Sequence, residues 1–337
     1  MDCPQEDLPV IHSTQRDVLP PPSEFQELLG SLPTRKDMMN ALHYCYNGFW
    51  FCEAILEGTT TFQQNFQAQD TDIILVTAPK SGTTWLKSLV FSITCRLQYK
   101  ISDKNHPLVT TNPHGLIPFF EFLYGDNKSL HMPVGKPRLL ATHLPYTLLP
   151  ESIKTSKCKI IYLCRNPRDT FVSMWHFRKK ILLKFDPSWQ FPSIEESLER
   201  FCEGVSKYGP FWEQILQFWK LSKESPEKVL FLKYEDLKGD IIAQCKNIAD
   251  YLNCSFSSEE ENEGVIEDIA KFCSFEHLSN LEVNKSNEEG NVPLIENNMF
   301  FRKGEIGDWK NLLTTSMAEK LDQLVEQKLH GSGLKLN

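Results

Sequence analysis

Residues 72–85 read DIILVTAPKSGTTW, and this stretch decides the fold of the chain. Its first seven residues are mostly apolar and several are β-branched, which is typical of a strand buried in a parallel sheet. From Thr83 onward apolar residues recur every three or four positions, and this spacing predicts a helix over residues 83–97. A strand, a short polar loop and a helix therefore follow one another directly.

The loop PKSGTT between strand and helix has the properties of a phosphate-binding loop. The start of a helix directs free backbone N–H groups at an anion, and Gly82 lets the backbone come close to it. Thr83 and Thr84 add hydroxyl donors, and Lys80 adds a positive charge. The pattern differs from GxxxxGKS/T, because it lacks the first glycine and has Thr83 where that motif has lysine. The alternative is a plain helix cap, which does not explain why Lys80 and Trp85 flank it.

Other segments resemble this first unit in composition. Three short apolar runs predict strands at residues 138–142, 159–164 and 229–233. Helices are predicted at residues 168–183, 194–223, 241–252, 259–273 and 315–329. Strands that alternate with helices predict an α/β fold, with a central parallel sheet flanked by helices.

The ends of the chain give fewer signals. Residues 1–35 are rich in proline, and we expect an irregular tail there, followed by a single domain over residues 36–337. Residues 280–309 have no periodicity, which is typical of a lid or binding loop. The last helix carries an apolar stripe that indicates packing in the core or between two subunits; it consists of Met317, Leu321, Leu324 and Val325.

Composition argues against several classes of function. The chain has 36 basic and 44 acidic side chains, a net charge of -8, which disfavours a nucleic-acid partner. Its ten cysteines form no CxxC pair and have no histidine cluster near them, so we expect no metal site and a reducing cytoplasm. The N-terminus lacks an apolar signal, and no apolar run approaches the roughly 20 residues of a membrane helix. We therefore expect a soluble cytoplasmic enzyme without a membrane partner.

The segment PKSGTTW resembles the loop that holds the 5′-phosphosulfate in the cytosolic sulfotransferases. These enzymes use 3′-phosphoadenosine 5′-phosphosulfate (PAPS) as sulfuryl donor, so the resemblance implies the sulfotransferase fold, PAPS as co-substrate and no metal. It covers about residues 49–336. It rests on three further segments, which are PRLLATHLP at 137–145, KIIYLCRNPRDTFVSMWHF at 159–177 and FRKGEIGDWK at 301–310.

Two of these segments resemble the family's site for the 3′-phosphate. Arg165 follows the predicted strand at 159–164, and Ser173 lies in the next helix. A guanidinium fork together with a hydroxyl group suits a terminal phosphate, while either residue alone is common on a protein surface. The Arg-Lys-Gly turn at residues 302–304 resembles the second element of the site, and a solvated basic turn is its alternative reading.

The resemblance also assigns the adenine pocket and the whole donor site. Trp85 and Phe275 stack on the adenine, and Tyr234 lines the same pocket. Lys80 lies on the bridging oxygen and stabilises the leaving phosphate. The implied donor-binding residues are Lys80, Ser81, Gly82, Thr83, Thr84, Trp85, Arg165, Ser173, Tyr234, Cys273, Phe275, Arg302, Lys303 and Gly304.

The segment PRLLATHLP supplies the candidate base. His143 follows a predicted strand, at the edge where parallel α/β sheets place their active sites. An imidazole with a pKa near neutrality suits proton abstraction, although a single histidine is more often structural. The resemblance makes His143 the general base for the acceptor and Lys80 its catalytic partner, which Ser173 restrains until the acceptor arrives. It implies an acceptor pocket suited to a flat aromatic substrate, with walls formed by Phe119, Phe122 and Phe177.

The sequence departs from the family in three places. Ala141 stands where animal members have a lysine two residues before the base, which removes one cation from the implied site. Cys273 replaces a threonine near the adenine. The family's dimer motif KxxxTVxxxE corresponds to KNLLTTSMAE, from Lys310 to Glu319, in which threonine replaces valine. A homodimer through this segment is therefore one of two alternatives, and a monomer is the other.

Several strings resemble the plant branch of the family, namely NPHGLIPF, CRNPRDTFVSMWHF, FCEGVSKYGPFWEQIL and CSFEHLSNLEVNK. We therefore predict transfer of a sulfuryl group from PAPS to a hydroxyl group of a small plant metabolite. A flavonol is the first choice, and a brassinosteroid or hydroxyjasmonate is the alternative. A nucleotide-dependent kinase is a weaker alternative, because the loop lacks the lysine that such enzymes need. A protein that only sequesters the desulfated nucleotide is disfavoured because His143 and Lys80 are both present.

Overall fold

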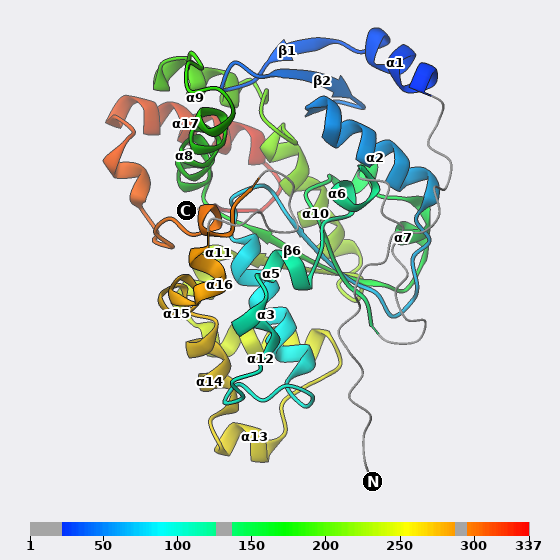
Figure 1. The fold of residues 1–337 in the computed structure, drawn as a ribbon, viewed down its shortest axis with the longest axis vertical. Coiled ribbons are helices and arrows are strands. Elements are labelled where there is room, and N and C mark those ends of the chain that lie inside the picture. Colours follow the sequence, from blue (N-terminus) through cyan, green and yellow to red (C-terminus); the bar gives the residue numbers. More distant parts are fainter. Residues whose placement is uncertain (1–21, 126–136, 287–294, 337) are drawn as a thin grey trace.

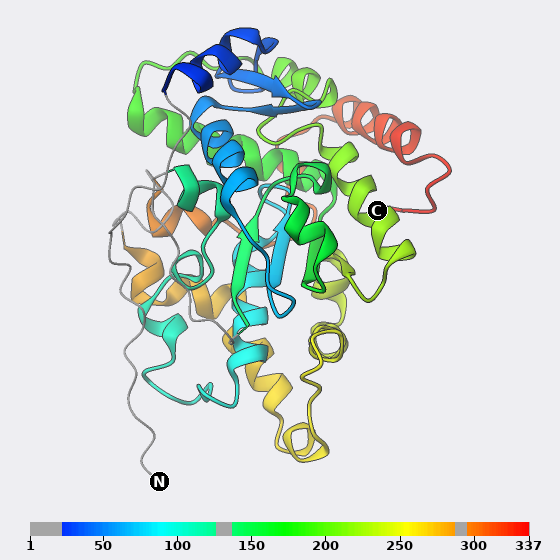
Figure 2. The ribbon, with the colours of Figure 1, turned by 90° about the vertical axis from the view of Figure 1, so that its right-hand side faces the viewer.

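The computed structural model describes residues 22–125, 137–286 and 295–336. At its centre lie four parallel strands in the order β5-β4-β6-β7. They are β4 (Ile73–Thr77), β5 (Leu139–Thr142), β6 (Lys159–Cys164) and β7 (Val229–Lys233). Helices cover both faces of the sheet (Figure 1, Figure 2), which confirms the predicted α/β fold.

Alternate residues of β4 face two different cores, as the two-residue period of a strand requires. On one face Ile74 and Val76 belong to the larger core, together with residues of α2 (Glu53–Asn65), α8 (Pro167–Phe185), α10 (Phe211–Glu224) and α17 (Thr315–Leu329). On the other face Ile73 and Leu75 belong to the smaller core, with α3 (Thr83–Cys95), α12 (Ile241–Tyr251) and α14 (Val265–Phe272). Since both faces are covered, β4 is apolar throughout rather than alternating.

The chain leaves the sheet toward opposite faces after β4 and after β6. The helix after β4 is α3, which packs in the smaller core, whereas the helix after β6 is α8, which packs in the larger one. In open α/β sheets the carboxyl ends of such neighbouring strands border a crevice that binds ligands. The phosphate loop after β4 and Arg165 after β6 therefore lie at the same edge of the sheet.

Shorter elements connect these parts. Before the sheet's second strand the chain forms α4 (Pro107–Thr110), α5 (Pro113–Leu116) and α6 (Phe120–Gly125). Between β5 and β7 lie η1 (Tyr146–Leu148), α7 (Glu151–Thr155) and α9 (Ile194–Cys202). After β7 come α11 (Tyr234–Gly239), α13 (Ser258–Asn262), α15 (Phe275–Asn280), α16 (Glu282–Lys285), η2 (Asn297–Phe300) and η3 (Asp308–Asn311).

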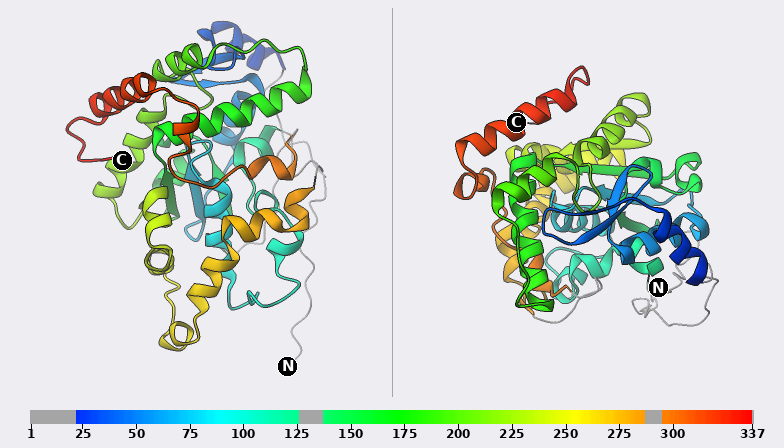
Figure 3. Two further views of the ribbon diagram at one scale, coloured as in Figure 1. Left: turned by 90° about the vertical axis from the view of Figure 1, so that its left-hand side faces the viewer. Right: turned by 90° about the horizontal axis from the view of Figure 1, so that it is seen from above.

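The N-terminal region contains structure that the sequence analysis missed. Three short strands, β1 (Thr34–Lys36), β2 (Leu42–Tyr46) and β3 (Phe49–Phe51), form an antiparallel sheet at the top of Figure 1, which Figure 3 also shows from above. Helix α1 (Pro22–Ser31) precedes it and buries Phe25 and Leu29. The predicted irregular tail over residues 1–35 is therefore wrong from residue 22 onward, because a helix carries two apolar side chains into the core. Residues 1–21 lie outside the described part, and the single domain over 36–337 stays a prediction.

Two predicted helices are in fact pairs of helices. The prediction over residues 194–223 is interrupted between α9 and α10, where Gly204 has φ +83° and Pro210 lacks the N–H that a helix interior needs. The prediction over residues 259–273 is interrupted at Gly264, which has φ +75° and separates α13 from α14. Apolar periodicity alone could not locate either break.

The segment at residues 280–309 also contains short elements, namely α16 and η2 and the start of η3, while residues 287–294 lie outside the described part. In α17 the predicted stripe packs within the subunit, because Met317, Leu321 and Val325 belong to the larger core. Among the described residues, the helices are all too short or too polar to cross a membrane.

A buried ion pair fixes the starts of β4 and β5. Asp72 is fully buried, and its carboxylate accepts hydrogen bonds from Arg138 Nε at 2.7 Å and from Arg138 Nη2 at 2.5 Å. Its backbone carbonyl accepts from the N–H of Lys159 at 2.9 Å, at the start of β6. A two-point contact of this kind is stronger and more directional than a single one. Asp72 therefore connects the starts of three strands, because it precedes β4 and contacts Arg138 before β5 and Lys159 in β6.

We predict that Asp72→Ala lowers the free energy of unfolding by about 3–5 kcal/mol, because it leaves the Arg138 charge buried without its partner. Chemical denaturation of the two proteins measures this difference. Glu203→Ala is the matched control, since it removes an ion pair whose side chains, Arg35 and Glu203, are half exposed. We expect a loss below about 1 kcal/mol for the control. Equal losses in the two variants would contradict the assigned role of burial.

Candidate active site

A cavity of about 580 Å³ opens at the carboxyl ends of β4, β5 and β6. Its wall brings together every residue that the sequence analysis assigned to the donor, to the acceptor or to catalysis, except Ser81. Ser81 is fully buried within the loop. The lining runs from Cys52 to Gly304 in the sequence, so the fold gathers distant segments around one space.

The phosphate loop is held in an unusual backbone conformation. Lys80 has φ +68° and Gly82 has φ +108°, so two residues in left-handed conformation flank Ser81. A side chain at Gly82 would approach Tyr234 Cδ2 to 2.8 Å, which leaves room for glycine alone. The loop leads into α3, a helix of 13 residues whose first N–H groups face the cavity end of the sheet. The predicted strand-loop-helix unit is confirmed.

Lys80 is a half-buried side chain in the cavity wall. Its Nζ lies 3.8 Å from the centre of the Phe177 ring. Burial, and then the positive charges of Arg302 and Arg165, lower the pKa of Lys80 to about 7. An anion bound between these three cations would favour the charged form of the lysine.

His143 follows β5 and is fixed by the end of β4. Its Nδ1 lies 2.7 Å from the carbonyl oxygen of Thr77, and since a carbonyl only accepts, Nδ1 carries the proton. The other ring nitrogen, Nε2, is therefore left with its lone pair. Burial lowers the pKa of His143 to about 3, opposed by the Thr77 contact and reinforced by the charges of Lys87 and Lys207. The ring is neutral at physiological pH and can accept a proton.

A buried carboxyl group that the sequence analysis missed holds the backbone around this base. Glu121 accepts hydrogen bonds from the backbone N–H of His143 at 2.9 Å, from the Thr142 hydroxyl at 2.9 Å and from the Tyr208 hydroxyl at 3.0 Å. Burial raises the pKa of Glu121, while these donors oppose the shift. Nothing in sequence spacing connects Glu121 with Tyr208, because their segments meet only in the folded chain.

A second missed group lies beneath the phosphate loop. Lys87 is fully buried, and its Nζ lies 3.0 Å from His114 Nδ1. The other ring nitrogen of that histidine, Nε2, lies 2.9 Å from the Thr84 hydroxyl. His114 is part of the string NPHGLIPF, and Lys87 lies two residues after PKSGTTW. Only the fold shows that they touch.

The two predicted 3′-phosphate elements meet at the wall of the cavity. Arg165 donates to the backbone carbonyl of Glu305 at 2.5 Å, and Ser173 on α8 is buried at the wall. Arg302 and Lys303 each lie 2.5 Å from a different carboxylate oxygen of Asp308. Burial opposes ionisation of Asp308, but hydrogen bonds from the two basic residues and from Asn311 lower its pKa. In this form of the protein the carboxylate holds the basic pair.

The aromatic residues predicted for adenine surround one end of the cavity. The Trp85 and Tyr234 rings meet edge to face at 5.2 Å, and the Tyr234 hydroxyl donates to the carbonyl of Gly304 at 3.1 Å. Gly304 has φ +68°, and a side chain there would approach Phe275 Cδ2 to 2.5 Å. Cys273 is fully buried with its Sγ 3.3 Å from the Ser92 hydroxyl, so it packs behind this wall.

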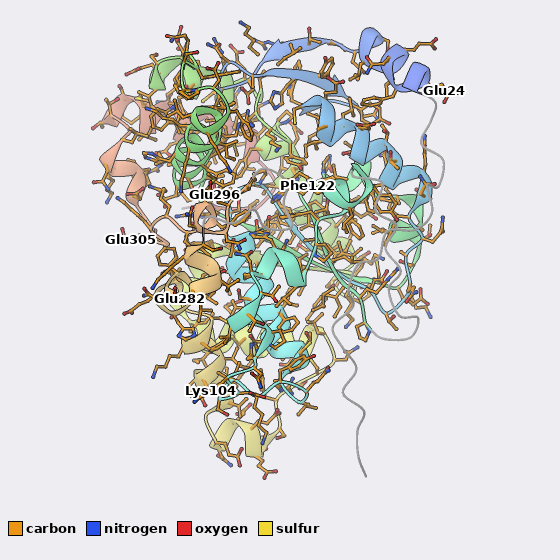
Figure 4. The ribbon with its side chains drawn as sticks, in the orientation of Figure 1. Glu24, Lys104, Phe122, Glu282, Glu296 and Glu305 are labelled. Carbon is orange, nitrogen blue, oxygen red and sulfur yellow. The ribbon has the colours of Figure 1, made fainter. Side chains whose placement is uncertain are left out.

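The residues predicted for the acceptor lie at the other end, around the base. The Phe119 ring lies 4.6 Å from the His143 ring and meets the Phe122 ring edge to face at 5.6 Å. Phe122 belongs to α6, and Figure 4 marks it in the middle of the molecule. Phe177, under Lys80, stands between the two ends. Polar phosphate groups and a flat apolar body would thus bind to different parts of one cavity.

Buried polar atoms test whether the cavity fits an anionic nucleotide. Among the described residues, Ser81 Oγ, Trp85 Nε1, Arg165 Nε and Arg302 Nε have no hydrogen-bond partner. Buried donors in native proteins are nearly always paired, so unpaired ones beside a cavity indicate a ligand that accepts hydrogen bonds. A nucleotide with several phosphate oxygens supplies such acceptors, and the residues therefore fit PAPS.

Comparison with known proteins agrees with this geometry. The family described as "Sulfotransferase domain" matches residues 70–333. Cytosolic sulfotransferase 12 of Arabidopsis thaliana is 49% identical over 317 residues, which cover 93% of this chain and 94% of that protein. Cytosolic sulfotransferase 13 of the same plant is 45% identical over 312 residues, covering 93% of each chain.

Solved structures have the same fold. A putative steroid sulphotransferase of Arabidopsis thaliana superposes with a TM-score of 0.74 at 41% identity, covering 95% of this chain and 99% of that one. A mouse sulfotransferase solved in complex with PAP superposes with a TM-score of 0.66 at 27% identity, covering 86% of this chain and 95% of that one. The kinase alternative loses its support. The chain belongs to the sulfotransferase family, and most of its length is similar to the cytosolic sulfotransferases of a plant.

Proposed function

We propose that the protein transfers the sulfuryl group of PAPS to a hydroxyl group of a flavonol or a closely related plant metabolite. The observation that carries the proposal is the orientation of His143, whose Nδ1 donates to the Thr77 carbonyl and whose Nε2 is free to accept a proton. Thr77 is the last residue of β4, the strand that leads into the phosphate loop. A base and a phosphate site are thus held by one element.

In the proposed reaction His143 Nε2 accepts the proton of the acceptor hydroxyl, and that oxygen attacks the sulfur in line with the bond to the departing phosphate. When bound, PAPS supplies the sulfuryl group and leaves as the desulfated nucleotide, PAP. Lys80 and the hydroxyl groups of Thr83 and Thr84 stabilise the negative charge that develops on the departing phosphate oxygen. Arg165, Ser173 and the turn at residues 302–304 hold the 3′-phosphate.

The walls around His143 support an aromatic acceptor. Phe119 and Phe122 form an edge-to-face corner beside the base, a shape that accommodates a flat ring between two faces. A steroid is the second candidate, because the Arabidopsis protein that is 41% identical is described as a putative steroid sulphotransferase. Hydroxyjasmonate remains the third.

We place the enzyme in the cytosol, since its relatives are named cytosolic sulfotransferases. We also keep the homodimer through residues from Lys310 to Glu319 as a prediction. In the single chain this segment runs from η3 into α17, and Thr314, Thr315 and Ser316 on it are exposed.

We predict that His143→Ala lowers kcat/KM for a flavonol acceptor by about 10²–10⁴-fold, which is the usual contribution of a general base. Steady-state sulfation with PAPS measures the loss, and calorimetric titration with PAP should give an unchanged affinity, because His143 lies outside the phosphate site. His330→Ala, at an exposed histidine after α17, is the control and should behave as wild type. If His143→Ala sulfates the acceptor as fast as wild type, the proposed mechanism is wrong.

The pKa of about 7 for Lys80 gives a second prediction. Bound phosphate favours the charged lysine, so binding of PAP above pH 7 takes up a proton, and affinity falls as pH rises from 7.5 to 9, by up to about tenfold per unit. The phosphates of PAP do not contribute, since their last pKa is about 6.

Calorimetric titration of PAP at pH 8 in two buffers of different ionisation enthalpy counts these protons. Lys80→Met should bind PAP more weakly, with little proton uptake and a flatter pH dependence. The same uptake in wild type and Lys80→Met would show that another group titrates.

A further inference from the structure

Lys87 is a fully buried lysine that the proposed mechanism does not use. It lies on α3, one turn after Thr84, and does not reach the cavity wall. Its Nζ lies 3.0 Å from His114 Nδ1 and 3.4 Å from the centre of the Phe119 ring. Burying a lysine is costly unless the charge is compensated, and among the described residues no carboxylate forms an ion pair with it.

Lys87, His114 and Thr84 form a chain of hydrogen bonds in which each group donates to the next. A protonated amine only donates, so His114 Nδ1 accepts and the ring proton lies on Nε2. That N–H then donates to the Thr84 oxygen, 2.9 Å away. Burial and the nearby charge of Lys87 lower the pKa of His114, so its ring is neutral and carries a single proton. The Thr84 hydroxyl proton is left free to point into the cavity, which Thr84 lines.

We propose that Lys87 and His114 are positioning residues, which orient and polarise the Thr84 hydroxyl as a donor to the 5′-phosphate of the nucleotide. The inference rests on the proposed function and extends it by two residues. A hydrogen bond in which a charged group is the first donor is stronger than a neutral one, and each donor in such a chain strengthens the next.

The same arrangement explains how Lys87 tolerates its site. Burial lowers the pKa of Lys87, and the charge of Glu121 opposes this shift. An anionic nucleotide at the loop adds a second negative charge nearby and so favours the protonated amine. Burial is the main cause of the lowered pKa of His143 and the charge of Lys87 a smaller one, so the base stays neutral without Lys87, which acts on the reaction through Thr84.

A double-mutant cycle tests this chain. Thr84→Val removes the hydroxyl with little change in shape, and Lys87→Met removes the charge. We expect about a hundredfold loss of kcat for Thr84→Val and about tenfold for Lys87→Met, with melting temperatures recorded for every variant. Because Lys87 acts through the hydroxyl, the double variant should be no slower than Thr84→Val alone. Losses that multiply would overturn the proposal.

His114 provides a pair of variants that remains informative if Lys87→Met does not fold. His114→Gln keeps an N–H donor near the position of Nε2, whereas His114→Phe keeps a ring against Phe119 and Phe300 but donates nothing. We expect His114→Gln to retain most of kcat and His114→Phe to match Thr84→Val. Equal rates for the two His114 variants would overturn the chain. If the wild-type protein does not sulfate any acceptor with PAPS, the proposed function is wrong instead.

A different observation concerns the acceptor end of the cavity. Lys207 follows α9 and lines the cavity with Cys52, Phe122 and Tyr208. Its Nζ lies 5.8 Å from the centres of the Phe122 and Tyr208 rings. Within the described ranges no acidic side chain forms an ion pair with it, and Arg178, the next cation, is already paired with Asp37 at 2.9 Å. The acidic group nearest the base, Glu121, accepts its three hydrogen bonds from other donors.

We infer that Lys207 binds an anionic group on the acceptor, a carboxylate or a sulfate, at the end of the cavity away from the nucleotide. This deepens the proposed function, because it separates charged acceptors from neutral steroids. Removing a lysine ammonium from water into a mainly apolar wall costs free energy. A bound anion offsets this cost, because it forms an ion pair with the ammonium. Burial lowers the pKa of Lys207, and an anionic acceptor would reverse this shift.

Two pairs of acceptors that differ by one charge test this inference. The first pair is hydroxyjasmonate and its methyl ester, and the second is a flavonol monosulfate and the parent flavonol. In wild type we expect kcat/KM to favour the charged member of at least one pair by about tenfold or more, the value of a charge-assisted hydrogen bond. Lys207→Met should abolish that preference, and Lys207→Arg should retain it.

The ratio within a pair is the readout, because a change of rate common to both members cancels. The pair that shows the preference identifies the anion as a carboxylate or a sulfate. Ratios that are the same in wild type and Lys207→Met would overturn the inference while leaving the proposed function intact. If wild type sulfates neither member of either pair nor a steroid, the proposed acceptor class is at fault instead.

Discussion

The hydrogen bond between the Thr77 carbonyl and His143 Nδ1 joins the two halves of the active site. Thr77 ends the central strand, and its hydroxyl lies 2.6 Å from that of Thr83 in the phosphate loop. The same residue therefore fixes the tautomer of the base and touches the first turn of the helix that faces the phosphate. Because β4 is buried on both faces and anchored at its start by Asp72, neither half can move without the other. The geometry of the reaction thus depends on the rigidity of one five-residue strand.

The cavity carries positive charge, whereas the protein as a whole is negatively charged. The chain has a net charge of -8, yet Lys80, Arg165, Arg302 and Lys303 meet at one end of a single space. Burial is the main cause of the lowered pKa of Lys80, and repulsion by Arg302 and Arg165 adds to it. A multiply charged anion relieves this repulsion, so the empty site carries an electrostatic cost that binding removes. Attraction of an anion therefore comes from the cations that line the cavity, rather than from the net charge of the protein.

Sequence reasoning could predict the parts of this protein that depend on local pattern. The strand-loop-helix unit and the parallel sheet follow from short motifs and apolar runs, whereas most residues assigned to the cavity followed from the resemblance to the sulfotransferases. It failed where structure depends on contacts distant in sequence: the N-terminal sheet, the breaks at Gly204 and Gly264, and the partners of the base. Glu121, Tyr208, Lys87 and His114 have no spacing signature, because a buried hydrogen-bond network can be assembled from any elements that the fold brings together. Burial of a polar or ionisable side chain is the signal that identifies them, and it requires coordinates.

The contact of Asp308 with Arg302 and Lys303 has a consequence for how a 3′-phosphate enters. A phosphate that approaches this turn meets an anion already in place, so its binding is an exchange of one anion for another rather than the neutralisation of bare charge. Replacing the Asp308 carboxylate by a phosphate changes the local charge less than adding a phosphate to unpaired cations would. The affinity for the phosphate therefore depends less on ionic strength. When the nucleotide departs, the carboxylate is covalently tethered nearby and can retake the basic pair. In the structure described, the basic pair of the proposed 3′-phosphate site is thus held by a carboxylate of its own turn.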